Sequence, residues 1–213
     1  MTSDHQTAIL PIRRLGLSCA VIFTLAVITL DITETVAVLR GIGVDYPSVA
    51  VGLINPLSFL GVLVAVHLTA PVGKRMWSLI GVVFGSLWVA VSVPAYFLQL
   101  TVVRWGDTSV RSFADLRAAP WAQNVLGWGL FLGIAALASS RVFEGTRRAR
   151  LARWLLAASG ASMLTLLTGF AMSLTWLALA GGIVGWFITL PATGIVLASI
   201  FHRMDMACLG PSD

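Results

Sequence analysis

Six long apolar stretches, separated by short segments with turn or charge signals, constrain this chain more than any other feature. A helix that crosses the hydrocarbon core of a bilayer needs about twenty mostly apolar residues. Six stretches reach that length: residues 16–39, 48–70, 77–101, 121–140, 152–176 and 180–201. In lipid every backbone polar group must be satisfied internally, which a helix achieves within one segment. We therefore predict an all-α integral membrane protein that forms a bundle of six transmembrane helices.

The scarcity of charged residues supports the same fold class. Hydrophobic residues make up 58% of the 213 residues and charged residues 11%, whereas a soluble domain carries roughly a quarter charged residues. The connecting segments are too short for a soluble unit, so we expect residues 1–213 to form a single, multi-pass domain of the cell membrane. The net charge of +5 comes from basic residues in short loops. Topology explains these residues, and we expect no nucleic-acid partner.

The distribution of basic residues predicts the orientation of the bundle. With the N-terminus in the cytoplasm, ten arginines and lysines fall on the inner side and four on the outer side. Cytoplasmic loops carry such an excess, so both termini are predicted to be cytoplasmic. The outer segment 104–120 is weakly amphipathic and is either a short surface helix or a lid. The boundary between the last two spans is predicted at Gly181-Gly182, inside a nearly continuous apolar run.

Small residues and prolines inside the spans predict how the helices pack. Glycines four residues apart are typical of close helix contacts. They occur as Gly81 with Gly85 and Gly129 with Gly133, and a further small-residue run extends from Ala157 to Ala161. Proline removes a backbone donor, so kinks or local cavities are expected where it interrupts a span. Three prolines do so: Pro56, Pro94 and Pro191.

Ionisable side chains are costly inside a membrane and suggest a functional site. The first stretch carries Asp31 and Glu34, three residues apart and therefore on nearly the same face. At 1.5 Å per residue, Asp31 lies roughly 12 Å below the outer boundary and Glu34 roughly 7 Å. These two carboxyl groups are the candidate catalytic residues.

Other polar and aromatic residues reach the same depth from four further spans. The candidate ligand-binding residues are Asn55, Tyr96, Gln99, Asn124, Trp128 and Trp186. The inner half of the predicted bundle has few polar residues by comparison. The sequence thus predicts a one-sided polar layer in the outer half of the bilayer.

Structural roles compete with functional ones for each of these residues. Glu34 is close enough to the interface to reach water or to pair with Arg40 or Arg104. Asp31 could form a buried hydrogen-bonded pair with Asn55, Gln99 or Tyr96, and the Asn55 amide could cap a carbonyl freed by Pro56. The tryptophans could be packing residues or part of an interfacial belt.

No metal or cofactor site is predicted. The three histidines, His5, His67 and His202, are far apart in the sequence, and neither cysteine accompanies them at ligand spacing. There is no phosphate-binding loop, no dinucleotide fingerprint and no serine-histidine-aspartate order.

Three classes of function fit these features. The first is an intramembrane enzyme or binding protein for a lipophilic small molecule, such as an isoprenoid-like substrate that undergoes acid-initiated isomerisation or cyclisation. Asp31 would act as the general acid, because desolvation disfavours a carboxylate in apolar surroundings. The second is a small proton- or cation-coupled transporter that uses Asp31 and Glu34. The third is a non-catalytic accessory or sensor subunit. The expected partners are membrane lipid and the lipophilic molecule, and a homo-oligomer is compatible with the sequence.

Overall fold

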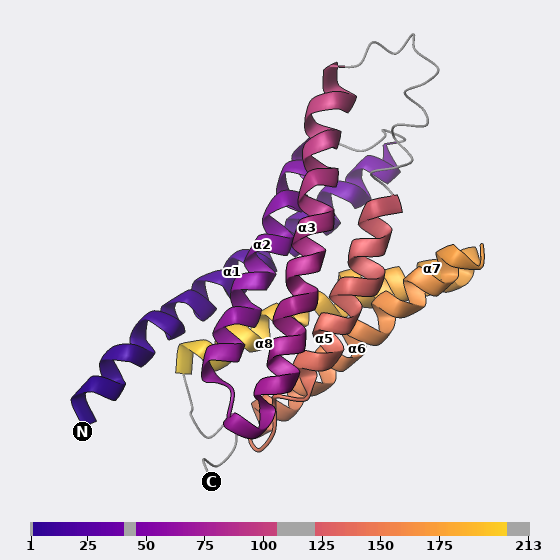
Figure 1. Ribbon diagram of the computed structural model, residues 1–213. Helices are drawn as coiled ribbons and strands as arrows, with labels where there is room; N and C mark the ends of the chain where they lie inside the picture. The colour runs from indigo at the N-terminus through magenta and orange to yellow at the C-terminus, as the bar shows by residue number, and fades with distance from the viewer. Residues whose placement is uncertain (1, 41–45, 106–121, 204–213) are drawn as a thin grey trace.

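The structure, a computed structural model, describes residues 2–40, 46–105 and 122–203, and within them it contains helices and turns but no β-strand. Figure 1 shows the helices as a bundle. They are α1 (Thr2–Leu39), α2 (Tyr46–Thr69), the 3₁₀ turn η1 (Val72–Lys74), α3 (Arg75–Trp105), the π-helix η2 (Gly127–Leu132), α5 (Gly133–Ser140), α6 (Arg147–Ala171), α7 (Thr175–Gly182), the π-helix η3 (Ile183–Thr189) and α8 (Leu190–Arg203). Residues 122–126 are also helical and lead into η2.

Six helical segments are long and apolar enough to cross a membrane, which confirms the predicted all-α bundle. They are Leu10–Val36, Ser48–Thr69, Val72–Thr101, Ala122–Ser140, Arg147–Ala171 and Thr175–Arg203. Each span packs against the next along the chain, and α8 returns to pack against α1. The six spans therefore form a closed ring in sequence order, the arrangement that short connections favour.

The first and last spans are tied together near one end of the bundle. The Arg13 side chain donates hydrogen bonds to the main-chain carbonyl oxygens of Phe201, at 3.1 Å, and of His202. Arg13 and the end of α8 thus lie on the same side of the ring, as an even number of spans requires. That this side is cytoplasmic is a prediction from the arginine bias, and the single-domain assignment is a prediction from the short connecting segments. Of the predicted surface segment 104–120, residues 106–120 lie outside the described part of the chain.

The prediction for the boundary between the fifth and sixth spans is wrong. Helix α6 ends at Ala171, and the turn is at 172–174, whereas Gly181 and Gly182 lie inside a helix. Ser173 adopts a positive φ of 56°. The Leu174 N–H donates to the Gly169 carbonyl at 2.8 Å and the Ser173 N–H to the Phe170 carbonyl at 3.1 Å, which is the Schellman pattern of a helix C-terminus. Glycine usually occupies the left-handed position, so a serine there gives no glycine signal for the helix end.

The glycines of this region serve close helix packing. A methyl group on Gly169 would collide with the backbone of Ala178, and one on Gly160 would lie 2.6 Å from the Gly133 carbonyl oxygen. Helix α6 therefore approaches both α5 and α7 backbone to backbone. This is the role that small residues play in membrane bundles, and it confirms the expectation for Gly133 and the run that contains Gly160.

Aromatic side chains from three consecutive spans pack together in the interior of the bundle. Phe23, Phe59 and Trp88 are fully buried and come from α1, α2 and α3. The ring centroids of Phe23 and Phe59 are 4.8 Å apart, and those of Phe59 and Trp88 are 5.8 Å apart in an edge-on arrangement. Such contacts add to the burial of large apolar surfaces. The middle of the bundle is thus a packed core.

Candidate functional site

Two π-helical segments each contribute a tryptophan to one aromatic contact in the interior of the bundle. Trp128 belongs to η2 and Trp186 to η3, and both side chains are buried. Their ring centroids are 5.3 Å apart with an interplanar angle of 78°. Short π segments within α-helices occur frequently at functional sites, so this pair marks the place where the candidate site should be built.

The sequence explains one π segment and not the other. Pro191 lacks an N–H group and cannot donate to the carbonyl of Phe187, four residues earlier in η3. The expectation of a local distortion at Pro191 is therefore met by η3. No proline follows Gly127–Leu132 within its helix, and we have no sequence-level account of η2.

The larger pocket beside the tryptophan pair is mainly apolar. It has a volume of about 640 Å³ and lies between α1, η2, the α6–α7 hairpin and η3. Its walls are formed by Leu30, Glu34, Trp128, Leu166, Gly169, Phe170, Ser173, Thr175, Ala178, Leu179, Gly182, Ile183, Trp186 and Phe187. The Glu34 carboxyl group is the only ionisable group among these lining residues. The pocket therefore combines a large apolar wall with one acidic side chain.

A small second pocket shares Leu30, Glu34 and Trp128 with the first, and most of its lining residues carry a polar group. Its volume is about 30 Å³, enough for about one water molecule. It is lined by Leu30, Glu34, Ser48, Val49, Tyr96, Gln99, Asn124 and Trp128. Glu34 and Trp128 line both pockets. The Tyr96 and Trp128 rings, with centroids 6.4 Å apart, close the side of the small pocket towards α3.

Six of the eight residues singled out from the sequence thus line these two pockets: Glu34, Tyr96, Gln99, Asn124, Trp128 and Trp186. Asn124 is 1% exposed, and its Oδ1 accepts no hydrogen bond from the described residues. A buried acceptor without a donor is unusual in a folded protein. A ligand hydroxyl or a water in the small pocket would supply that donor.

Asp31 and Asn55 lie outside the two pockets. Asp31 is 9% exposed, and the Thr35 hydroxyl donates to its main-chain carbonyl at 2.7 Å. Among the described residues no side chain forms a hydrogen bond with the Asp31 carboxyl group. The predicted pair with Asn55, Gln99 or Tyr96 is therefore not formed. Asn55 is 1% exposed, and neither of its amide atoms has a partner in the described structure. It therefore does not cap the carbonyl freed by Pro56.

The sequence analysis missed the residues of the α6–α7 hairpin. Phe170, Ser173, Leu179 and Phe187 line the larger pocket, but the turn between the helices had been placed some eight residues too late. The signal that could have located it is polar: Ser173 and Thr175 interrupt an otherwise apolar run.

Comparisons with known proteins identify no family or relative for this chain. No protein-family model matches it, and no curated protein or solved structure does so. Within 2–40, 46–105 and 122–203, no three His, Cys, Asp or Glu side chains lie close enough to hold a metal ion. The fold and the pocket define the class: an all-α multi-pass membrane protein with six spans and a largely apolar pocket beside one carboxyl group.

Proposed function

We propose that this protein binds a lipophilic small molecule in the larger pocket and acts on it by acid-initiated isomerisation or cyclisation. The observation that carries the proposal is that Glu34 lines both a large apolar cavity, beside Trp128 and Trp186, and a water-sized pocket that Gln99 and Asn124 also line. An isoprenoid-like molecule with one small polar end has the matching chemistry.

The size and lining of the larger pocket support an apolar ligand. Pockets that enclose a small molecule typically measure about 300–1,000 Å³, and this one measures about 640 Å³. Leu179, Ile183 and Phe187 line it while remaining about half exposed. In a membrane such side chains contact acyl chains, so a lipid-soluble molecule can enter from the side without crossing water.

The small pocket supports one hydrogen-bonding group on that ligand. A hydroxyl group fits the space and can donate to Asn124 Oδ1, which otherwise has no donor in the described structure. Gln99 and Tyr96 line the same space. A buried polar atom gains free energy when such a partner arrives, and this gain favours one orientation of the ligand.

The chemistry follows from a carboxyl group beside aromatic rings. The Glu34 carboxyl group donates a proton to an alkene carbon of the substrate, and the other alkene carbon becomes a carbocation. The faces of Trp128 and Trp186 stabilise the positive charge. Loss of a different proton to the Glu34 carboxylate restores the acid and yields an isomer, or a ring when a second double bond attacks first. Asp31, about one helical turn deeper on α1, is the nearest carboxyl group along α1 with which Glu34 can exchange a proton.

Transport is the alternative, and the packing of the core argues against it. A carrier needs a polar path to the other side of the membrane. Phe23, Phe59 and Trp88 are fully buried and form a packed apolar cluster between α1, α2 and α3 instead.

The test combines binding with turnover on the full chain in lipid nanodiscs. All-trans-retinol, an isoprenoid alcohol whose absorption overlaps tryptophan emission, serves as the binding probe, and energy transfer is titrated. Trp186→Ala removes a buried aromatic wall and should weaken binding by roughly 10- to 150-fold, from about 1.5–3 kcal/mol of lost apolar burial. Trp176→Leu is the matched control, because Trp176 is exposed and lines neither pocket.

Turnover is measured with geranylgeraniol as substrate and chromatographic detection of its isomers and cyclic products. Glu34→Gln should abolish product formation while retinol binding is retained, and Glu144→Gln, at the other end of the bundle, should leave both unchanged. Retinol binding that is equally strong in the Trp186 variant, or product formation by Glu34→Gln, contradicts the proposal. Proton-driven uptake by proteoliposomes would establish the transport alternative instead.

A further inference from the structure

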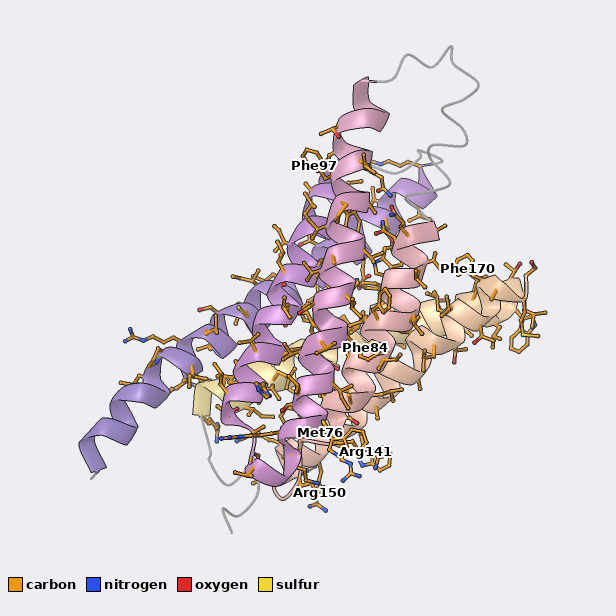
Figure 2. The ribbon with its side chains drawn as sticks, viewed as in Figure 1. Met76, Phe84, Phe97, Arg141, Arg150 and Phe170 are labelled. Atoms are coloured by element: carbon orange, nitrogen blue, oxygen red, sulfur yellow. The ribbon has the colours of Figure 1, made fainter. Side chains whose placement is uncertain are left out.

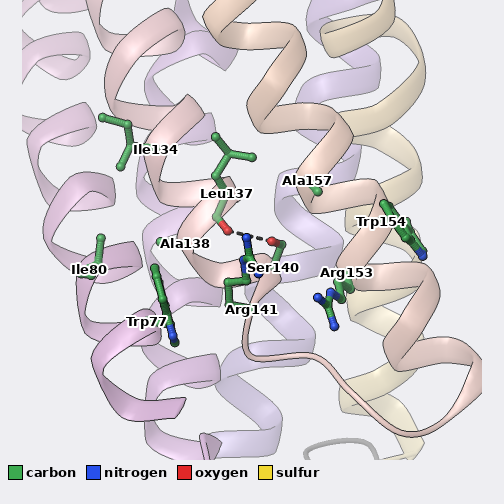
Figure 3. Close-up of a pocket in the computed structure, with 10 residues that line it drawn as sticks. All are labelled: Trp77, Ile80, Ile134, Leu137, Ala138, Ser140, Arg141, Arg153, Trp154 and Ala157. Carbon is green, nitrogen blue, oxygen red and sulfur yellow. Dashed lines mark hydrogen bonds between the residues drawn. The ribbon is translucent and has the colours of Figure 1, made fainter.

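A third pocket, distinct from the two around Glu34, lies at the opposite end of the bundle from the candidate site. Its volume is about 450 Å³, and it lies between α3, α5 and α6. Figure 3 shows Trp77 and Trp154 on its two sides, with Arg141 and Arg153 between them. Above the arginines the walls are aliphatic, formed by Ile80, Ile134 and Leu137. The pocket thus has a cationic, aromatic mouth and an apolar interior.

Positive charge dominates this end of the bundle. Residues 141–153 contain five arginines and one glutamate. Figure 2 shows Arg141 and Arg150 at this end and Phe97 towards the other. The Glu144 carboxylate bonds to Lys74 at 2.7 Å, and its oxygen is 3.7 Å from Arg153 Nη1. The latter distance exceeds the hydrogen-bonding range, so Arg153 keeps its donors available.

Arg141, unlike Arg153, has no carboxylate nearby among the described residues. Its guanidinium lies 5.9 Å from the centroid of the Trp77 ring, and among the described residues it forms no ion pair with a carboxylate. Arginine presents several donors in a planar fork that matches phosphate geometry. Two such forks at the mouth of one pocket are suited to a single phosphate group.

The aromatic residues place the mouth of the pocket at the membrane surface. Trp154 is 71% exposed and Trp77 is also exposed. Tryptophans enriched at span ends sit at the level of the lipid headgroups. A phosphate held by Arg141 and Arg153 would therefore lie at headgroup depth, and a chain attached to it would run along Ile80, Ile134 and Leu137.

We propose that this pocket binds an anionic phospholipid, with the phosphate between Arg141 and Arg153 and one acyl chain along the aliphatic wall. Basic pockets between transmembrane helices on the cytoplasmic side bind such headgroups, and the arginine bias predicts that this side is cytoplasmic. The site is separate from the proposed function, since it shares no residue with the two pockets around Glu34.

The experiment is native mass spectrometry of the full-length protein in detergent, titrated separately with phosphatidylglycerol, phosphatidylcholine and inorganic phosphate. The wild type should bind one phosphatidylglycerol in preference to phosphatidylcholine. A membrane-facing cation contributes about fivefold in affinity, so Arg141→Gln with Arg153→Gln should reduce that preference by roughly 25-fold. Arg150→Gln removes one charge from an exposed residue outside the pocket and should change it by less than about twofold.

A further double variant and one measurement keep the test independent of folding. Arg141→Lys with Arg153→Lys retains both charges and should recover part of the preference, and the helical content of every variant is compared by circular dichroism. An equal loss in Arg150→Gln would show a general electrostatic effect and overturn the proposal. Displacement of the lipid by inorganic phosphate at equal concentration would show a phosphate site and overturn it as well.

Discussion

Gly181 allows a quantitative test of the α6–α7 packing. A methyl group added at this position would lie 2.5 Å from the Leu166 main-chain nitrogen and 2.6 Å from the Ser162 carbonyl oxygen. Ordinary contact begins at 3.4 Å, so the two helices must separate by about 0.9 Å, the difference between 3.4 and 2.5 Å. Both obstacles are backbone, and no side chain can rotate away to relieve them.

The expected cost of Gly181→Ala follows from these distances. Overpacking a well-packed interface costs about 1–3 kcal/mol, and rigid backbone contacts favour the upper end. Alanine recovers about 1 kcal/mol because it is a better helix former than glycine. The net destabilisation should be about 2 kcal/mol. Unfolding by sodium dodecyl sulfate in mixed micelles, followed by circular dichroism, measures it.

Gly182 supplies the matched control. A methyl group there meets Leu166 Cδ1, the end of a flexible side chain, at 3.1 Å. Gly182→Ala should therefore leave stability unchanged or raise it by up to about 1 kcal/mol. If Gly181 and Gly182 formed a turn instead of a helix, the two variants would be affected similarly. Equal unfolding midpoints for the two variants would refute the packing argument.

Three further predictions concern the core, the buried hydroxyl groups of Ser159 and Thr189, and the charged end of the bundle. Trp88→Ala empties a fully buried site and should cost about 3–5 kcal/mol in the same unfolding assay. Ser159→Ala removes a 2.9 Å hydrogen bond to the Thr189 hydroxyl, which also donates to a main-chain carbonyl, and should cost less than about 1 kcal/mol. The Lys74 hydrogen bond lowers the pKa of Glu144 below its ordinary 4.5, so its stabilising contribution is present above pH 4.5 and is lost as the pH falls through the lowered value. Glu144→Gln should remove that part of the acid dependence, and an unchanged pH profile of unfolding would contradict it.

The spans could be predicted because length and apolar content suffice for a membrane helix. Depth along a span can also be counted, and this placed Tyr96, Gln99 and Asn124 at one level, where the structure brings them together around the small pocket. Rotation about the helix axis cannot be counted in the same way. Asp31 and Glu34 share a face within about 60°, yet Glu34 lines the pockets and Asp31 does not.

The remaining features depend on backbone geometry that single residues do not reveal. The helix end at Ser173 uses a residue that rarely adopts a positive φ, and η2 contains no residue that requires a π-helix. The helix end at Ser173 and the π-helix η2 each change the positions of the following residues from those that a regular α-helix would give them. The hairpin wall of the larger pocket was missed for this reason.

The π segment η3 has a consequence for how the last span meets its neighbours. A π turn acts as one residue inserted into an α-helix, and one residue corresponds to a rotation of about 100°. Before it, α7 packs on α6; after it, α8 packs on α1 as well. The two halves of this continuous span therefore point their packing faces in different directions, one towards α6 and the other towards α1, and the second contact closes the ring. A single-residue deletion within 183–189 would restore a regular helix and turn one face away from its partner, so this segment should tolerate substitution far better than a change of length.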